Sequence, residues 1–399
     1  MLTILDLGTS KITGISVSTE NHQSKVEAFS YKPTSGLKRG SIINITETSQ
    51  AIKEVTADLQ QQSGGKVRDI QISFSGEQIS SRNNSGVSKI SDREVSHTDM
   101  HAALQSALVM HIPSEKEMLN VIPSEYTIDG QPGIKEPKGM TGVRLEVRAH
   151  VIYSSKNSIS NIKKCVEEMN DLNISKYFYS QVGAAKCILS SDQMDLGVCL
   201  IDIGAGTSDI TVYKNGCLIF SKVLPYAGDY ITEDIASSLK ISLSQAEEIK
   251  KKYGSAISKN IPDEMLKTNG INGKIDNKVS RRMLCEVIEQ SVSNIIRSVM
   301  QNIEDSGLKD VLSAGYVITG GTANLQEIED LGAIITQDSF RIGNPGHHLP
   351  LNSEKIILPQ FAAPLGMVKY CIEEQNKEFT FNQSKGIIAR VLDWLKNNM

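Results

Sequence analysis

The sequence predicts an α/β protein built from two related halves, and three observations support this. The chain opens with short strand patterns separated by polar turns, at Leu2–Leu7, Ile12–Ser18 and Val26–Tyr31. The same pattern returns at Val198–Ile203, Thr207–Tyr213 and Cys217–Leu224, the last two joined through the hairpin signal Asn215-Gly216. Segments with apolar residues at helical spacing, such as Thr46–Gln62, follow these strands.

The likeness between the halves is literal at one turn. Residues 9–13 read Thr-Ser-Lys-Ile-Thr and residues 207–211 read Thr-Ser-Asp-Ile-Thr, so four of five positions are identical. Each stretch follows an Asp-x-Gly, at Asp6–Gly8 and at Asp202–Gly204. The offset is 198 residues, about half the chain, which favours a duplicated domain.

The composition excludes several classes of protein. The 399 residues carry 42 basic and 46 acidic side chains, a net charge of −4, and 39% are hydrophobic. A balance so close to neutral argues against a nucleic-acid binder, and we expect no nucleic-acid partner. Six cysteines without a C-x-x-C pair indicate reduced thiols. Since the first residues lack a signal-peptide pattern and no apolar run reaches about 18 residues, we expect a cytoplasmic protein.

The two halves are expected to be interrupted and extended. Residues 80–158 have a different texture, polar with a helical stretch near His97–Met110 and an alternating strand at 145–151, which predicts an inserted small α/β subdomain. The prolines and glycines of 123–142 predict loops there. The expected division is 1–79 with 159–195 as the first core subdomain, 196–228 with 303–372 as the second, 229–302 as a mainly helical subdomain, 373–385 as a linker and 386–399 as a C-terminal helix.

The two repeated turns carry the chemistry of a polyphosphate site. Glycine lets backbone N–H groups approach phosphate oxygens, and hydroxyl and ammonium groups add donors. Because two carboxylates would repel phosphates, Asp6 and Asp202 are expected to hold a hydrated Mg²⁺ that neutralises the phosphates and orients water. A single Asp-x-Gly turn is common in β-proteins, so the duplication carries this prediction. The candidate phosphate-binding residues are Gly8, Thr9, Ser10 and Lys11 in the first half and Gly204, Ala205, Gly206 and Thr207 in the second.

A third glycine-rich element follows the strand predicted at Gly315–Thr319. Gly320, Gly321 and Thr322 come directly after it, and Thr322 or Asn324 is expected to cap a following helix. This geometry suits the close passage of an adenosine. The chain has no G-x-x-x-x-G-K-[ST] motif, and Gly204-Ala-Gly206 lacks the third glycine of a dinucleotide fingerprint, which argues against both of those nucleotide-binding classes.

Together the three elements resemble the phosphate-1, phosphate-2 and adenosine motifs of the actin, sugar-kinase and heat-shock-chaperone superfamily. Within it the sequence is similar to the FtsA family of bacterial actin-like division proteins. The stretches that carry this likeness are Ile72–Gly76, Val121–Tyr126 with Ile128–Gly130, Leu196–Asp202, Pro225–Gly228 and Ile231–Ala236.

The resemblance implies an actin-like ATPase fold with a nucleotide cleft between the halves, and an insertion at 80–158 that is the family's own subdomain. It implies that ATP and Mg²⁺ bind, that Gly228, Glu247 and Lys250 line the sugar and base, and that Gln181 in the segment Gln181–Ala185 positions water. A neutral amide orients water but is no base at neutral pH. Ala205 stands where the family's loop has glycine, so we expect tight binding, slow turnover and a mainly structural role.

The last fourteen residues, Gly386–Met399, predict an amphipathic helix. Placed 100° apart, six apolar residues fall within one arc: Ile387, Ile388, Val391, Leu392, Trp394 and Leu395. At about 1.5 Å per residue the helix is too short to cross a bilayer, so it would lie in the membrane interface. The alternative is a helix docked on its own domain. The chain's only Trp, the polar linker and the similar ending of FtsA proteins favour the membrane.

The expected function is therefore an ATP-binding protein that polymerises with itself on the cytoplasmic face of the bacterial inner membrane at the division site. By resemblance, it anchors filaments of the tubulin-like FtsZ to an anionic membrane surface and meets other division proteins through the inserted subdomain. Two alternatives on the same fold stay open: a soluble small-molecule kinase, which would need a further catalytic carboxylate, and a pilus-assembly adaptor.

Overall fold

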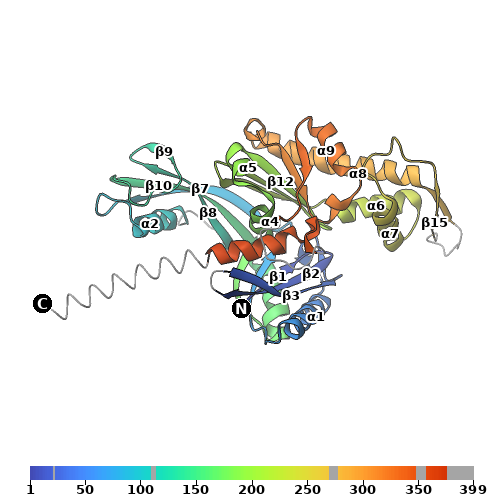
Figure 1. Cartoon of the computed structure of the whole chain (residues 1–399), viewed down its shortest axis with the longest axis horizontal. Helices are drawn as coiled ribbons and strands as arrows, with labels where there is room; N and C mark the ends of the chain where they lie inside the picture. Colours follow the sequence, from blue (N-terminus) through green and yellow to red (C-terminus); the bar gives the residue numbers. More distant parts are fainter. Residues whose placement is uncertain (21–22, 109–113, 269–276, 347–355, 375–399) are drawn as a thin grey trace.

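The structure is a computed structural model of the chain, and it describes residues 1–20, 23–108, 114–268, 277–346 and 356–374 (Figure 1). The inserted subdomain lies at one end of the long axis and the helical subdomain at the other, with the two sheets of the halves between them (Figure 1). No helix in these ranges is long and apolar enough to cross a membrane.

The first half is a five-stranded sheet in the order β11-β6-β1-β2-β3. Strands β1, β2 and β3 form an antiparallel meander, and β6 and β11 run parallel to β1. Helix α1, Ile45–Ser63, packs on β2 and β3, begins at the Asn44 cap and ends at Gly64. The strands are β1 Leu2–Leu7, β2 Lys11–Glu20, β3 Gln23–Pro33, β6 Asp69–Phe74 and β11 Asn173–Tyr179.

The second half repeats this plan in the order β14-β13-β12-β17-β18. Here β12, β13 and β14 form the antiparallel meander, and β17 and β18 continue the sheet in parallel. The two strand orders coincide when β1 is matched to β12, which confirms the predicted duplication. The strands are β12 Val198–Ile203, β13 Ser208–Lys214, β14 Cys217–Leu224, β17 Tyr316–Thr319 and β18 Phe340–Ile342.

The insertion is a four-stranded sheet, β7-β10-β8-β9, with helix α2, His97–Leu108, on one face. Its strands are β7 Ser80–Lys89, β8 Lys116–Ile128, β9 Gln131–Ile134 and β10 Arg144–Ser155. The prediction of loops or turns from Pro123 on was wrong for residues 123–128 and 131–134, which are strands, and right for the turn at 129–130. Strand β8 runs through Pro123 because a bulge in its pairing with β10 falls at that point, where a missing N–H is tolerated.

The segment after β14 contains α6 Gly228–Leu239, α7 Leu243–Tyr253 and α8 Arg281–Asp305. It also contains a hairpin, β15 Met265–Thr268 with β16 Asn277–Ser280, that the sequence analysis missed because four-residue strands are too short to show a period. The remaining elements are β4 Leu37–Lys38, β5 Ser41–Ile42, α3 Lys156–Lys163, the short π-helix η1 Lys164–Glu168, α4 Ser180–Ile188, α5 Ser191–Leu196, the short 3₁₀ helices η2 Lys309–Val311, η3 Gly321–Asn324 and η5 Pro359–Phe361, and α9 Ile328–Thr336.

A last helix covers residues 362–374 and crosses α4 at two glycines. A Cβ added at Gly366 would lie 1.9 Å from the carbonyl oxygen of Gly183, and one added at Gly183 would lie 2.6 Å from the backbone nitrogen of Met367. The helix continues through Glu373, which pairs with Lys186 of α4 at 2.7 Å, so the first residues of the expected linker are helical. This crossing fixes the position of α4, which carries Gln181.

We predict that Gly366→Ala lowers the free energy of unfolding by roughly 1–3 kcal/mol, because the added methyl group forces two backbones apart. The matched control is Gly65→Ala, whose methyl group would have only the Met1 Cε atom nearby, at 3.9 Å, and which should change stability by less than about 0.5 kcal/mol. Urea denaturation measures both. Equal stabilities of the two variants would contradict this account of the crossing.

Candidate functional site

Two carboxylates from the two halves stand at equivalent positions. Asp6 lies near the end of β1 and Asp202 near the end of β12. Each of these strands pairs with one parallel strand of its own sheet, β1 with β6 and β12 with β17. Asp6 Oδ1 accepts a hydrogen bond from the Ser73 hydroxyl at 2.6 Å. Asp202 Oδ2 accepts one from the Gln181 amide at 2.9 Å, so the first half also contacts the carboxylate of the second.

The electrostatics of this pair reflect burial and the charged and polar groups around it. Burial, helped by the charge on Asp202, raises the pKa of Asp6 to about 6 against the opposing effects of Ser73 and Lys11. Burial also raises the pKa of Asp202, opposed by Gln181 and Lys11. The pKa of Lys11 is lowered by burial, while both carboxylates act to raise it. The ammonium of Lys11 lies 5.2 Å from the centroid of the Phe361 ring.

Asp209 is a third buried carboxylate at this centre, and the sequence analysis missed it. Its Oδ1 accepts hydrogen bonds from the hydroxyls of Ser75 and, at 2.9 Å, Tyr179, both in the first half, and its Oδ2 accepts one from Thr207 at 3.2 Å. Burial, and then the charge on Asp202, raise the pKa of Asp209 to about 7. The signal was in the repeat: Asp209 stands where the first half has Lys11, the one position at which the two five-residue stretches differ.

The two repeated turns have the same backbone geometry and touch each other. The N–H of Gly8 donates to the Lys11 carbonyl oxygen at 3.1 Å, as that of Gly204 does to Thr207 at 2.9 Å. A Cβ on Gly206 would lie 2.6 Å from Thr9 Oγ1. That hydroxyl oxygen accepts a hydrogen bond from the N–H of Gly40 at 3.0 Å. The turns predicted from the sequence therefore meet across the two halves.

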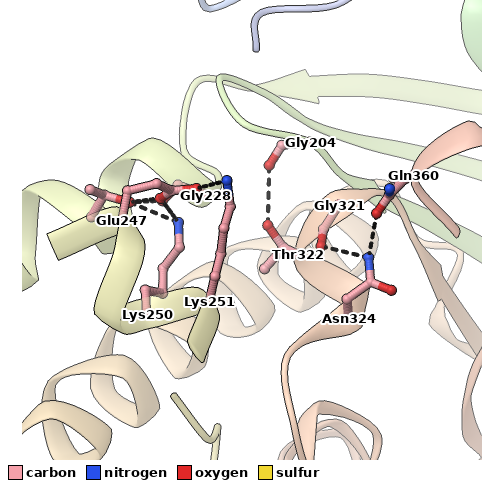
Figure 2. Close-up of polar contacts among 10 residues, drawn as sticks. Gly204, Gly228, Glu247, Lys250, Lys251, Gly321, Thr322, Asn324 and Gln360 are labelled. Atoms are coloured by element: carbon pink, nitrogen blue, oxygen red, sulfur yellow. Dashed lines mark hydrogen bonds and ion pairs between the residues drawn. The ribbon is translucent and has the colours of Figure 1, made fainter. Parts of the chain in front are cut away.

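The third glycine element lies beside the same carboxylates. Gly320, with φ of 88°, leaves no room for a side chain, because a Cβ would lie 2.3 Å from Asp202 Oδ1. A Cβ on Gly321 would meet no atom within 4 Å. The Thr322 hydroxyl donates to the Gly204 carbonyl oxygen at 3.1 Å (Figure 2). Asn324 Nδ2 donates to the carbonyl oxygen of Gly321 and the amide oxygen of Gln360, both at 3.0 Å.

The expected helix cap was wrong. A 3₁₀ turn, Gly321–Asn324, follows Gly320, and α9 begins only at Ile328 after a left-handed Glu327 without a side-chain cap. Thr322 and Asn324 instead bind the backbone around the glycine turn, as described above.

Gly228, Glu247 and Lys250 form one cluster where α6 meets α7 (Figure 2). The Lys250 ammonium donates to the Gly228 carbonyl oxygen at 2.9 Å and to the Thr232 hydroxyl at 2.7 Å, and pairs with Glu247 at 2.5 Å. Burial alone would raise the pKa of Glu247, but Lys250, with further hydrogen bonds, lowers it to about 2. The N–H of Gly228 donates to Gly204 at 3.0 Å, so this cluster is joined to the second turn.

The described part of the chain thus brings together the residues predicted for phosphate, sugar, base and metal around one set of turns. Ser10 is exposed and Ala205 accepts a hydrogen bond from the N–H of Asp229 at 2.7 Å. The six residues predicted to bind a membrane, 387–395, lie outside the described residues.

The raised pKa values predict how stability depends on pH. The folded protein keeps protons on Asp6 and Asp209 up to about pH 6 and 7, whereas in an unfolded chain these groups lose them near 3.8. The folded state therefore binds more protons over this window, and the free energy of unfolding falls as the pH rises from about 4 to 7. Asp209→Asn removes one of these titrating groups. It should therefore raise the free energy of unfolding by roughly 1–3 kcal/mol at pH 8 and change it little at pH 4.

Urea denaturation across this pH range, in EDTA and without nucleotide, measures the effect. The control is Asn at the exposed Asp310, which should leave the pH slope unchanged. An unchanged slope in Asp209→Asn would show that this carboxyl titrates normally.

Two family models match the chain. The one described as "Cell division protein FtsA" matches residues 199–366, and the one described as "SHS2 domain inserted in FTSA" matches residues 76–153. Full-length relatives agree. The cell division protein FtsA of Pseudomonas aeruginosa is 32% identical over 410 residues, covering 100% of this chain and 98% of the relative. That of Escherichia coli K12 is 30% identical over 372 residues, covering 91% and 88%.

Solved structures agree on the fold. A PilM–PilN type IV pilus biogenesis complex matches with a TM-score of 0.65 at 16% identity, covering 92% of this chain and 96% of the other. MreB5 of Spiroplasma citri bound to ADP matches with a TM-score of 0.57 at 15% identity, covering 94% and 98%. The fold is the predicted actin-like ATPase fold with its inserted subdomain. The full-length identity shows that the chain belongs to the FtsA family of actin-like cell division proteins.

Proposed function

We propose that the site where the two halves meet binds ATP with Mg²⁺. The observation that carries this proposal is the contact between the duplicated turns, which surrounds three carboxylates with glycine backbone and hydroxyl groups. The MreB5 structure, which shares this fold, is described as bound to ADP. Asp6 and Asp202 would hold hydrated Mg²⁺. The turns Gly8–Lys11 and Gly204–Thr207 would hold phosphates, Gly320–Thr322 the adenosine, and Gly228, Glu247 and Lys250 the sugar and base.

The residues of the centre fit a hydrated Mg²⁺. Asp6 and Asp202 supply hard oxygen ligands, which this cation prefers. The amide oxygen of Gln181 is buried and has no hydrogen-bond partner among the described residues, although its nitrogen is bonded to Asp202. Such an oxygen suits a donor, for example a water molecule. When bound, Mg²⁺ would neutralise phosphate charge and polarise the terminal phosphoryl group.

The same residues favour slow hydrolysis. Gln181 can orient a water molecule through its free amide oxygen, but an amide takes up no proton at neutral pH. Asp209 has a pKa near neutrality, but its carboxylate already accepts hydrogen bonds from Ser75, Tyr179 and Thr207. We therefore propose a nucleotide-binding scaffold with low turnover, in which binding matters more than hydrolysis.

Gly321 offers a test that separates nucleotide binding from folding. Because a Cβ there meets no protein atom within 4 Å, Gly321→Ala should change the free energy of unfolding by less than about 0.5 kcal/mol. If adenosine passes this turn, the methyl group obstructs it, and the affinity for Mg-ATP should fall by about tenfold or more, which corresponds to about 1.4 kcal/mol. Calorimetric titration with Mg-ATP measures the affinity, with Gly65→Ala as the control. An unchanged affinity would remove Gly321 from the site.

We further propose that the protein polymerises on the cytoplasmic face of the inner membrane at the division site. There it would attach FtsZ filaments and recruit later division proteins through the inserted subdomain. Membership of the FtsA family supports the division role. The apolar arc of residues 387–395, with its single Trp, supports membrane attachment. One such helix binds weakly, so a filament that presents many helices to one bilayer would hold far more firmly.

Reconstitution on anionic liposomes tests this proposal. With Mg-ATP the full chain should sediment with the liposomes, form filaments visible by electron microscopy and carry purified FtsZ into the pellet. Removal of residues 384–399, or the double change Trp394→Glu with Leu395→Glu, should abolish sedimentation of both proteins, because charge on the apolar arc opposes insertion. The control Asn397→Ala with Asn398→Ala should bind normally. Equal sedimentation of the tail-deleted and full chains would refute membrane attachment through this helix.

A further inference from the structure

A cavity of about 560 Å³ lies between the inserted subdomain and the second half, away from the proposed nucleotide site. Strands β8, β9 and β10 supply one wall, and β14, the end of β13 and the residues that follow α8 supply the other. A cavity of this volume is large enough for a few side chains of a peptide or for a small ligand.

Two β-bulges shape the walls of the cavity. In β8 the extra residue is Ser124, between Pro123 and Glu125, which pair with Ala149 and Arg148. In β14 it is Ile219, between Leu218 and Phe220. Both bulged residues line the cavity. Since a bulge bends its strand and turns a side chain out of the regular alternation, the cavity is built by the same irregularity on both sides.

The lining combines apolar side chains with an excess of positive charge. Ile134, Ile219, Phe220 and Leu308 supply apolar surface, while Lys135, Arg148 and Lys214 carry positive charge against the single carboxylate of Glu125. Lys135 pairs with Asp195 outside the lining at 2.5 Å, and Arg148 is 4.0 Å from Glu125. The Lys214 ammonium donates to the backbone carbonyl oxygen of Leu196 at 2.8 Å. An occupant with aromatic side chains and a carboxylate would match this lining.

The C-terminal end of the last helix lies next to the strand that borders the cavity. The ring centroids of Tyr370 and Phe178 are 5.7 Å apart, and Tyr370 is hydrogen-bonded to Asn120 of β8. From Asn120 to Glu125 strand β8 extends about 17 Å, at about 3.3 Å per residue. Residues 375–378, if extended, reach about 13 Å, and the long side chains of Glu378 and Arg148 can span the remaining few Å.

The sequence of this stretch has the required chemistry. Residues 378–381 read Glu-Phe-Thr-Phe. In an extended chain Phe379 and Phe381 point to one side, because side chains alternate with a period of two. We propose that this segment, Glu378–Phe381, docks in the cavity of its own chain, with both Phe rings on the apolar surface and the Glu378 carboxylate near Arg148. The contact tethers the C-terminus to the inserted subdomain, and it requires neither nucleotide nor lipid.

Cys217 is a natural reporter for this docking. It does not line the cavity itself, but it starts β14 opposite the lining residue Lys214, and the charges of Lys135, Asp195 and Glu125 at the cavity's edge act on its thiol. The other five cysteines are buried, whereas Cys217 is partly exposed. Its rate of reaction with N-ethylmaleimide, an uncharged reagent, is followed by peptide mass spectrometry in the full chain without lipid or nucleotide. Docking of about nine-tenths of the molecules slows this rate about tenfold.

Phe379→Ala with Phe381→Ala should restore the fast rate, while the matched control Thr380→Ala with Asn382→Ala stays slow. Arg148→Glu should also give the fast rate, because it places a like charge next to Glu378. Adding Glu378→Arg to this variant should restore protection. The reference for each of these variants is the same protein with Phe379→Ala and Phe381→Ala added. Equal rates in the unaltered chain and the double Phe variant overturn the proposal. Protection that disappears on dilution also overturns it, because the occupant would then be the tail of a second copy.

Discussion

The central constraint in this molecule is that carboxylates from two different halves must stand close together in a partly buried site. Burial raises the cost of ionising both Asp6 and Asp202, and the charge on Asp202 adds to the cost at Asp6, so the surrounding structure has to compensate. Ser73 and Gln181 each donate one hydrogen bond, and Lys11 supplies positive charge. Because Gln181 belongs to the first half and Asp202 to the second, this compensation also joins the halves. The nucleotide function that we propose would use the charge imbalance that remains.

Much of the surrounding structure maintains this arrangement through close backbone contacts. Gly320 lets β17 end against Asp202, Gly206 lets the second turn meet the first, and the Gly183–Gly366 crossing holds the helix of Gln181. The glycines themselves bury no side chain at these contacts. Their common effect is geometric, since each removes a side chain where two backbones or a backbone and a carboxylate must approach. The glycines therefore set the distances on which the electrostatics depend.

Sequence reasoning could predict the fold and the proximity of Asp6 and Asp202, because the duplicated strand pattern and the two Asp-x-Gly turns are local signals. It could not predict that Asp209 joins them. That residue looks like an ordinary strand position. Only the hydrogen bonds from Ser75 and Tyr179, which are 134 and 30 residues away in the sequence, bring it into the centre. Strand β8 was missed because its pairing with β10 overrode the local turn signal of Pro123. The β15–β16 pair was missed because its four-residue strands are too short to show an alternating pattern. Thr322 has the side chain of a helix cap, but its hydroxyl instead donates a hydrogen bond to the Gly204 carbonyl oxygen in another turn.

The edge strands β7 and β14 meet where the inserted subdomain contacts the second half, with β8 and β10 also touching β14, but β7 and β14 do not form a ladder with each other. Ser81 and Asn83 donate side-chain hydrogen bonds to the carbonyl oxygens of Ser221 and Ile219, at 2.9 Å each, and His150 lies between Asn83 and Ser221. Since no continuous backbone ladder crosses this boundary, the four-stranded sheet can separate as a unit without breaking either sheet. In native-state hydrogen exchange its amides would then form a cooperative group of their own, opening at lower free energy than the two central sheets.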